Sequence, residues 1–81
     1  MILNIKLLVL DIDGTIAGQS NRVSETVIKT LQTVQERGIK VALATGRMYC
    51  SALRFHEAIK SGLPIVAYNG AWIQDPLSIL F

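Results

Sequence analysis

Two carboxylates one residue apart, Asp11 and Asp13, follow directly on an apolar run that ends at Leu10. Like charges placed so close disfavour each other's ionisation unless a positive group lies between them. A divalent cation held by hard oxygen ligands is the usual reason for such a pair, with one carboxylate free to attack or to move a proton. Gly14 and Thr15 come next and offer backbone amides and a hydroxyl to an anion. The alternative is an ordinary Asx-type turn, in which Asp and Gly are common.

Two further polar segments, Thr45-Gly46-Arg47 and Asn69-Gly70, each follow a later apolar run. Thr45 is predicted at the opening of a helix, where free amides and the helix dipole favour an anion, or else as a plain N-cap. A cation in the first helical turn opposes the dipole, so Arg47 is expected to meet an anionic ligand or Asp13. Asn69-Gly70 is equally typical of a simple turn.

The elements that must position these residues alternate between strands and helices. The second helix carries a stripe that includes His56, a residue expected to be packed or at the surface, and Gly62 is predicted to end it. The expected elements are strands at Ile5–Leu10, Ile39–Ala44 and Ile65–Tyr68, a helix capped by Ser24 and closed by Gly38, and a helix from about Met48 to Lys60.

The predicted fold class is α/β: a partial doubly wound, Rossmann-like parallel sheet of about three strands with flanking helices. The short connections imply right-handed crossovers between parallel strands. The first strand is a nearly continuous apolar run, which predicts burial on both of its faces. Ligands bind at the carboxyl ends of the strands in such a sheet, so the three polar segments are expected to meet at one edge.

The last dozen residues depart from this alternation. Ala71-Trp72-Ile73 and Ile79-Leu80-Phe81 are short apolar segments on either side of a polar stretch, a pattern that predicts an antiparallel C-terminal hairpin. Tyr68 and Trp72 are expected to pack. An apolar end of this kind leaves a strand without a partner, so we expect the sequence to break off inside something larger.

Composition narrows the possible partners and location. Half of the residues are hydrophobic (51%), 17% are charged, and the net charge is +2, with the cations spread along the chain. This pattern indicates a folded chain without a nucleic-acid-binding surface. The lone Cys50, expected to be a small core residue or a half-buried helix residue, excludes an internal disulfide and fits a reducing compartment. Because no signal peptide or membrane-spanning run is evident, the expectation is a soluble cytoplasmic protein without a membrane partner.

These motifs resemble those of the haloacid dehalogenase-like superfamily of phosphohydrolases, most of all the amino-terminal part of its Cof-like, sugar-phosphatase branch. The run from Asp11 to Thr15 matches the first family motif, and Ala44-Thr45-Gly46-Arg47 matches the second. Tyr68-Asn69-Gly70-Ala71 resembles the segment that leads to the large inserted cap. The resemblance implies that residues 1–70 are the amino-terminal half of a core domain and that 71–81 begin the cap connection as a hairpin.

By the same resemblance, Asp11 is the nucleophile that forms an aspartyl-phosphate, and Asp13 protonates the leaving oxygen and then activates water. Mg2+ would bind the Asp11 carboxylate and the Asp13 backbone carbonyl. The phosphate- and substrate-binding residues would be Ile12, Gly14, Thr15, Thr45, Gly46, Arg47 and Asn69. The implied activity is Mg2+-dependent hydrolysis of a small phosphorylated metabolite such as a sugar phosphate.

The extent of the chain leaves alternatives open. The family's third motif, a lysine, and its fourth, a set of acidic metal ligands, lie beyond position 81, as does the cap that selects the substrate. The isolated chain is therefore expected to be poorly active. One alternative is an inactive truncated module that binds a partner or self-associates through the exposed edge of its first strand. Another is a phosphomutase or phosphotransferase that shares the covalent intermediate.

Overall fold

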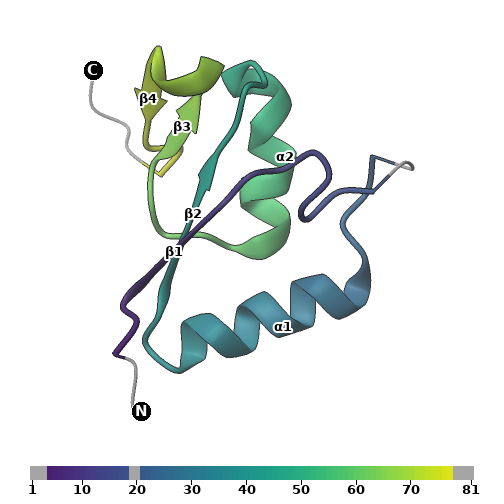
Figure 1. The fold of residues 1–81 in the computed structure, drawn as a ribbon, viewed down its shortest axis with the longest axis vertical. Helices are drawn as coiled ribbons and strands as arrows, with labels where there is room; N and C mark the ends of the chain where they lie inside the picture. The colour runs from purple at the N-terminus through teal and green to yellow at the C-terminus, as the bar shows by residue number, and fades with distance from the viewer. Residues whose placement is uncertain (1–3, 19–20, 78–81) are drawn as a thin grey trace.

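Four strands and two helices make up the fold in the computed structural model, which describes residues 4–18 and 21–77 (Figure 1). The helices and strands follow one another in the predicted alternation until β3. In chain order the elements are β1 (Leu7–Leu10), α1 (Glu25–Glu36), β2 (Lys40–Ala44), α2 (Tyr49–Ile59), β3 (Ile65–Ala67), the 3-10 turn η1 (Tyr68–Gly70) and β4 (Trp72–Gln74).

The sheet has the strand order β1-β2-β3-β4. β1 pairs with β2 and β2 with β3 in parallel, so the predicted α/β fold with three parallel strands is confirmed. β4 pairs antiparallel with β3, with Val66 opposite Ile73. A C-terminal hairpin is therefore present as predicted, but its arms are β3 and β4, whereas the predicted arms were 71–73 and 79–81. The expected arm at 79–81 lies outside the described residues.

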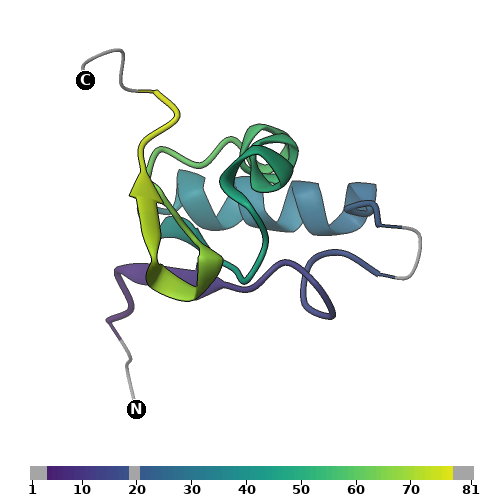
Figure 2. The ribbon, with the colours of Figure 1, turned by 90° about the horizontal axis from the view of Figure 1, so that it is seen from above.

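Both helices cover the same face of the sheet (Figure 2). Right-handed crossovers that step in one direction, from β1 to β2 to β3, place their helices on one side. Leu8 and Leu10 therefore pack on the core, whereas Leu7 and Val9 on the other face are 52% and 53% exposed. The prediction that the first strand is buried on both faces is wrong for this reason.

The core lies between this covered face and the two helices. Its largest fully buried side chains come from the loop after β1, from β2, from α2 and from β3: Ile12, Val41, Leu43, Phe55, Ile59 and Ile65. Because these side chains lock the three parallel strands against α2, the carboxyl ends of the strands are held at one edge of the sheet.

The helix ends agree in part with the predictions. Ser24 caps α1, its hydroxyl accepting a hydrogen bond from the Val27 amide at 3.2 Å, and Gly38 adopts a φ of 88° after the helix, as predicted. α2 ends instead at Lys60, which takes the left-handed conformation (φ 55°). Gly62 is therefore not the residue that closes this helix.

Several packing predictions are settled by burial. His56 is packed, being 4% exposed, and its Nε2 lies 2.8 Å from the Leu63 carbonyl oxygen. Tyr68 and Trp72, expected to pack, are 44% and 52% exposed because they lie beyond the part of the sheet that the helices cover. Cys50 is exposed and not half-buried. Within residues 4–18 and 21–77, no helix has the length and apolarity needed to cross a membrane.

Candidate active site

The buried side chain of Ile12 fixes the direction of the two carboxylates after β1. Ile12 is fully buried, whereas Asp11 and Asp13 on either side of it are exposed. Side chains alternate along extended backbone, so anchoring Ile12 in the core turns both carboxylates outward. The Ile12 amide donates to Asp11 Oδ1 at 2.7 Å. This amide, predicted to hold a phosphoryl oxygen, thus serves to orient Asp11 in the structure described here.

A tight turn follows the second carboxylate. The Ile12 carbonyl oxygen accepts hydrogen bonds from the amides of Thr15, Ile16 and Ala17, at 3.2, 3.1 and 2.9 Å. Gly14 adopts a φ of 77°, as expected of a glycine that reverses the chain, and its amide donates to the Ala17 carbonyl oxygen at 3.1 Å. The amides of Gly14 and Thr15, predicted to bind an anion, are therefore engaged within the turn, and the exposed Thr15 retains its hydroxyl for a ligand.

Thr45 joins the end of β2 to the segment after β3. Its amide donates to the Val66 carbonyl oxygen at 2.8 Å, and its own carbonyl oxygen accepts from the Asn69 amide at 3.0 Å. Thr45 as a whole is only 4% exposed, and its hydroxyl accepts a hydrogen bond from the Arg47 amide at 3.0 Å. The residue that caps α2 is Met48, so the N-cap alternative for Thr45 is wrong. Thr45 instead shapes the loop that precedes the helix.

Gly46 and Asn69 lie against each other at the same edge. A Cβ placed on Gly46 would lie 3.1 Å from Asn69 Oδ1, which is tighter than ordinary contact. Asn69 adopts the left-handed conformation, φ 54° and ψ 36°, in which asparagine is one of the few residues at ease. Glycine at position 46 therefore allows the side-chain amide of Asn69 to approach the loop after β2.

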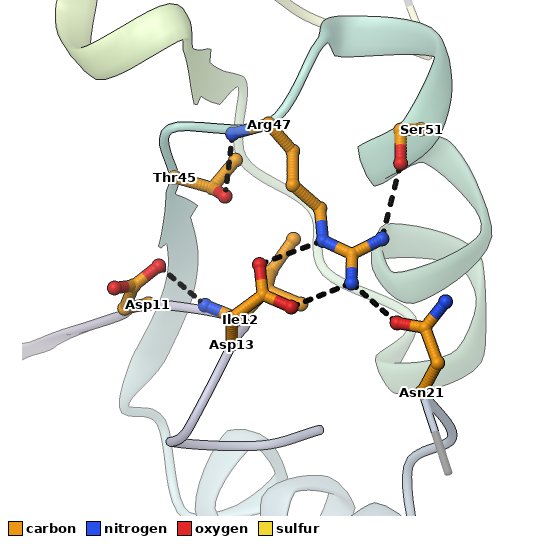
Figure 3. A network of polar contacts seen from close by, with 7 residues as sticks. All are labelled: Asp11, Ile12, Asp13, Asn21, Thr45, Arg47 and Ser51. Carbon is orange, nitrogen blue, oxygen red and sulfur yellow. Dashed lines mark hydrogen bonds and ion pairs between the residues drawn. The ribbon is translucent and has the colours of Figure 1, made fainter. Parts of the chain in front are cut away.

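Arg47 connects this loop to the second carboxylate (Figure 3). Its Nε donates to Asp13 Oδ2 at 2.8 Å, and its Nη2 donates to Asp13 Oδ1 at 2.6 Å. The guanidinium also donates to Asn21 Oδ1 and, at 3.1 Å, to Ser51 Oγ. Of the two predicted partners of Arg47, an anionic ligand or Asp13, the structure contains the contact with Asp13.

The pair changes the charge behaviour of both residues. The hydrogen bonds and positive charge of Arg47 hold the pKa of the Asp13 carboxyl below its usual value, against a weaker opposing effect of burial. The same bonds raise the pKa of the Arg47 guanidinium. Asp13 is therefore ionised at neutral pH, and the mutual repulsion expected of the two carboxylates is relieved by a cation that the chain itself supplies.

Three partners of Arg47 were not among the predicted site residues: Asn21, Ser51 and Phe55. The guanidinium carbon lies 4.8 Å from the centroid of the Phe55 ring. Spacing could have indicated two of them, because residues 47, 51 and 55 are four apart and share one face once the chain turns into a helix. Asn21 belongs to the polar loop after Ile16, and its contact depends on how that loop folds back, which no local pattern indicates.

The donor set fits a hard cation such as Mg2+. Asp11 presents an exposed carboxylate, and the Asp13 carbonyl oxygen accepts no hydrogen bond within the described part of the chain. Mg2+ is commonly held by one or two carboxylate ligands, waters and substrate phosphate. Among residues 4–18 and 21–77, no cluster of three or more Asp, Glu, His or Cys side chains forms a complete metal cage. Any coordination that these residues begin would have to be completed by other oxygen ligands.

The resulting edge can hold a phosphoryl group against a nucleophile. An outward carboxylate, the Thr45 hydroxyl, the Gly46 amide and the Asn69 side chain lie at neighbouring strand ends. Phosphoryl transfer depends mainly on positioning and on neutralising charge, and these groups are suited to both. The second carboxylate is oriented by Arg47 and is 61% exposed, so it is accessible to a ligand.

Comparison with known proteins agrees with this arrangement. Residues 8–80 match the haloacid dehalogenase-like hydrolase family. The chain is 34% identical over 70 residues to 5-amino-6-(5-phospho-D-ribitylamino)uracil phosphatase of Bacillus subtilis, an alignment that covers 86% of this chain and 26% of that protein. It is 32% identical over 77 residues to phosphoglycolate phosphatase of Methanothermobacter thermautotrophicus, covering 93% of this chain and 35% of the relative.

Solved structures show the same fold. A haloacid dehalogenase-like hydrolase from Bacteroides thetaiotaomicron superposes with a TM-score of 0.80 at 34% identity, over 86% of this chain and 27% of that one. A subclass IIB sugar phosphatase superposes with a TM-score of 0.72 at 25% identity, over 90% of this chain and 29% of that one. The chain thus spans roughly a quarter to a third of the length of these relatives. It belongs to the haloacid dehalogenase-like hydrolase family, and it corresponds to an amino-terminal portion of the Cof-like, subclass IIB phosphatases.

Proposed function

We propose that the protein containing this chain is a Mg2+-dependent phosphomonoester hydrolase that acts on a small phosphorylated metabolite of the sugar-phosphate kind. The observation that carries the proposal is the meeting of the Asp11–Asp13 pair with Thr45, Gly46 and Asn69 at one sheet edge. The printed functions of the relatives, which include a sugar phosphatase and a phosphoglycolate phosphatase, support this class of substrate.

In the first half of the proposed reaction, a carboxylate oxygen of Asp11 attacks phosphorus and the bond from phosphorus to the leaving oxygen breaks. Asp13 delivers a proton to that oxygen, so an alcohol leaves and an aspartyl-phosphate remains. Arg47 favours the ionised form of Asp13, but the negative charge of a bound phosphoryl group acts in the opposite direction and promotes its protonation. Mg2+ would be held by the Asp11 carboxylate and the Asp13 carbonyl oxygen, and it would supply positive charge that favours the attack on phosphorus.

In the second half, water attacks the aspartyl-phosphate and Asp13, now ionised, accepts the proton of that water. The resting geometry suits this step, because Arg47 already holds both carboxylate oxygens of Asp13 in place. Asp11 is released as a carboxylate together with inorganic phosphate. The Thr45 hydroxyl, the Gly46 amide and the Asn69 side chain would hold the phosphoryl oxygens through both halves.

Replacement of the nucleophile tests the proposal. Asp11→Asn keeps the size of the side chain and removes its charge, so Mg2+-dependent hydrolysis of an aryl phosphate should fall to near background in the natural polypeptide that contains these residues. Asp75→Asn is the matched control, since it makes the same chemical change in a turn whose Asp75 Oδ1 accepts from the Leu77 amide. Retention of most activity by Asp11→Asn would show that another group attacks phosphorus.

A second candidate function is suggested by the open sheet face, which we define as Leu7, Val9, Ala42, Ala44, Val66 and Ile73. We propose that the 81-residue chain, taken by itself, self-associates through this face and through the adjacent edge of β1. Support comes from exposure: Leu7, Val9 and Ile73 are 52%, 53% and 65% exposed although they are apolar. Such a patch is typical of a surface that contacts another protein segment.

A further inference from the structure

The side chain of Arg47 uses four of its five N–H donors in contacts within the chain. A guanidinium has five N–H donors and no acceptor. Four hydrogen bonds are directed at three residues: two to Asp13, one to Asn21 and one to Ser51. One N–H, on Nη1, is left over. A two-pronged contact between Arg47 and a phosphoryl group would therefore require that at least one of these contacts be given up, and the contact with Asp13 already takes the edge formed by Nε and Nη2.

Arg47 is the rigid member of its pair with Asp13. Its side chain is 17% exposed, against 61% for the carboxylate that it holds. One face of the guanidinium lies over the Phe55 ring, and Ser51, one helical turn before Phe55, accepts from Nη1. Because both partners belong to α2 and Phe55 is buried, the helix sets the position of the guanidinium and the guanidinium sets that of the carboxylate.

The two-pronged contact fixes orientation as well as distance. Parallel N–H···O bonds from Nε and Nη2 to the two carboxylate oxygens restrain rotation about the last bond of the Asp13 side chain. A lysine in the same place would supply the charge but not this restraint. An exposed ion pair contributes little to stability, so the orientation of the carboxylate is the main consequence of the contact.

We propose that Arg47 is a positioning residue that holds the Asp13 carboxylate on the leaving-group side of the site, and that it is not a ligand of the transferred phosphoryl group. The inference rests on the proposed phosphohydrolase function and deepens it. Asn21 takes part because its Oδ1 accepts from Nη2, the nitrogen that also contacts Asp13. The loop that carries Asn21 thereby helps to set the direction of the proton donor.

The test compares leaving groups in the natural polypeptide that contains these residues. Arg47→Lys retains the positive charge but cannot make the two parallel hydrogen bonds to the Asp13 carboxylate. For an alkyl phosphate, whose leaving oxygen needs a proton, kcat should fall about 10-fold to 100-fold. For p-nitrophenyl phosphate, whose leaving group needs little help, kcat should fall less than about threefold. Affinity for inorganic phosphate, measured as product inhibition and by calorimetry with Mg2+, should be unchanged.

Two further variants sharpen the comparison. Arg54→Lys is the matched control, because Arg54 also lies over the Phe55 ring, at 4.4 Å, without contacting Asp13. It should show no dependence on the leaving group. Asn21→Gly suits the left-handed backbone at Asn21 (φ 60°) and removes one contact of Nη2, so it should reproduce the leaving-group pattern more weakly even where Arg47→Lys folds poorly.

Equal losses for both substrates, together with about tenfold weaker phosphate binding in Arg47→Lys, would overturn the inference and make Arg47 a phosphate ligand. Unchanged kinetics with both substrates would overturn it as well. Failure of the underlying function looks different: Asp11→Asn would then retain the activity of the unmodified protein. The two ideas can therefore fail separately.

Discussion

Replacing Leu7 and Val9 on the open sheet face with threonine is expected to weaken self-association of the 81-residue chain about 100-fold. On this face Leu7 and Val9 are apolar and are 52% and 53% exposed. A dimer that covers the face removes this apolar surface from water, which favours association.

The magnitude follows from the two side chains. Both are about half exposed, so covering the remainder contributes about 1 kcal/mol for each. A symmetric dimer contains each position twice, and threonine retains part of the apolar surface, which leaves a loss of about 3 kcal/mol or ~100-fold in the dissociation constant. Threonine also favours strand backbone, so β1 itself should be retained.

Analytical ultracentrifugation over a concentration series measures the effect. Leu53→Gln is the control, because Leu53 is 37% exposed but lies on α2, away from the open sheet face. It should leave the association constant unchanged. The reasoning is refuted if the unmodified chain stays monomeric at high micromolar concentration, or if Leu53→Gln weakens association as much as the double replacement does.

Three further outcomes are expected. Asp13→Asn should abolish turnover of alkyl phosphates and spare part of the turnover of p-nitrophenyl phosphate, because it removes the proton donor; equal loss for both would contradict this. Arg47 lowers the pKa of Asp13 in the folded state. The ion pair therefore stabilises the folded chain at pH values above about 3.9, the pKa of Asp13 in the unfolded chain. This stabilisation is lost as the pH falls through the lower pKa that Asp13 has in the folded chain. The difference in Tm between the unmodified chain and Arg47→Met should accordingly shrink below about pH 4, whereas a constant difference would show that the pair adds nothing. Gly46→Ala places a Cβ 3.1 Å from Asn69 Oδ1, whose exposed side chain can move away; Tm should change little while phosphate inhibition weakens, and unchanged inhibition would remove Asn69 from the site.

Elements with local signals could be predicted to within a residue or two. The serine cap of α1 and the glycine after it are both determined by backbone groups nearby, so their sequence signatures were sufficient. The end of α2 was mispredicted because Lys60, and not the more permissive Gly62, takes the left-handed position. The next residue, Ser61, donates its hydroxyl to the Val41 carbonyl oxygen of β2 and so holds this end of the helix against the sheet. That contact joins residues twenty apart and has no local signature.

The burial of β1 could not be predicted for a different reason. An apolar run indicates that both faces of a strand are suited to burial, but not which elements cover them. Coverage depends on the direction in which successive strands are added, and here β2 and β3 are added on the same side. Leu7 and Val9 are thus apolar residues on a face that the described helices do not reach. Trp72 is exposed for a different reason: it is paired with the buried Ala67 on the covered face, but on β4, beyond the part of the sheet that the helices reach.

The candidate site shows where sequence reasoning stops. The convergence of three strand ends follows from topology, which the alternation of elements predicts, so Asp11, Thr45 and Asn69 could be placed at one edge without coordinates. The role of Arg47 could not be chosen in this way, since a guanidinium before a helix satisfies an anionic ligand and an aspartate equally well. The choice depends on how many of its five donors remain free. That number is set by Ser51 and by Asn21, from two segments that only the folded chain brings together. With four donors engaged, Arg47 orients the Asp13 carboxylate through its Nε and Nη2 edge, and a two-pronged contact with phosphate would require another of these contacts to be released.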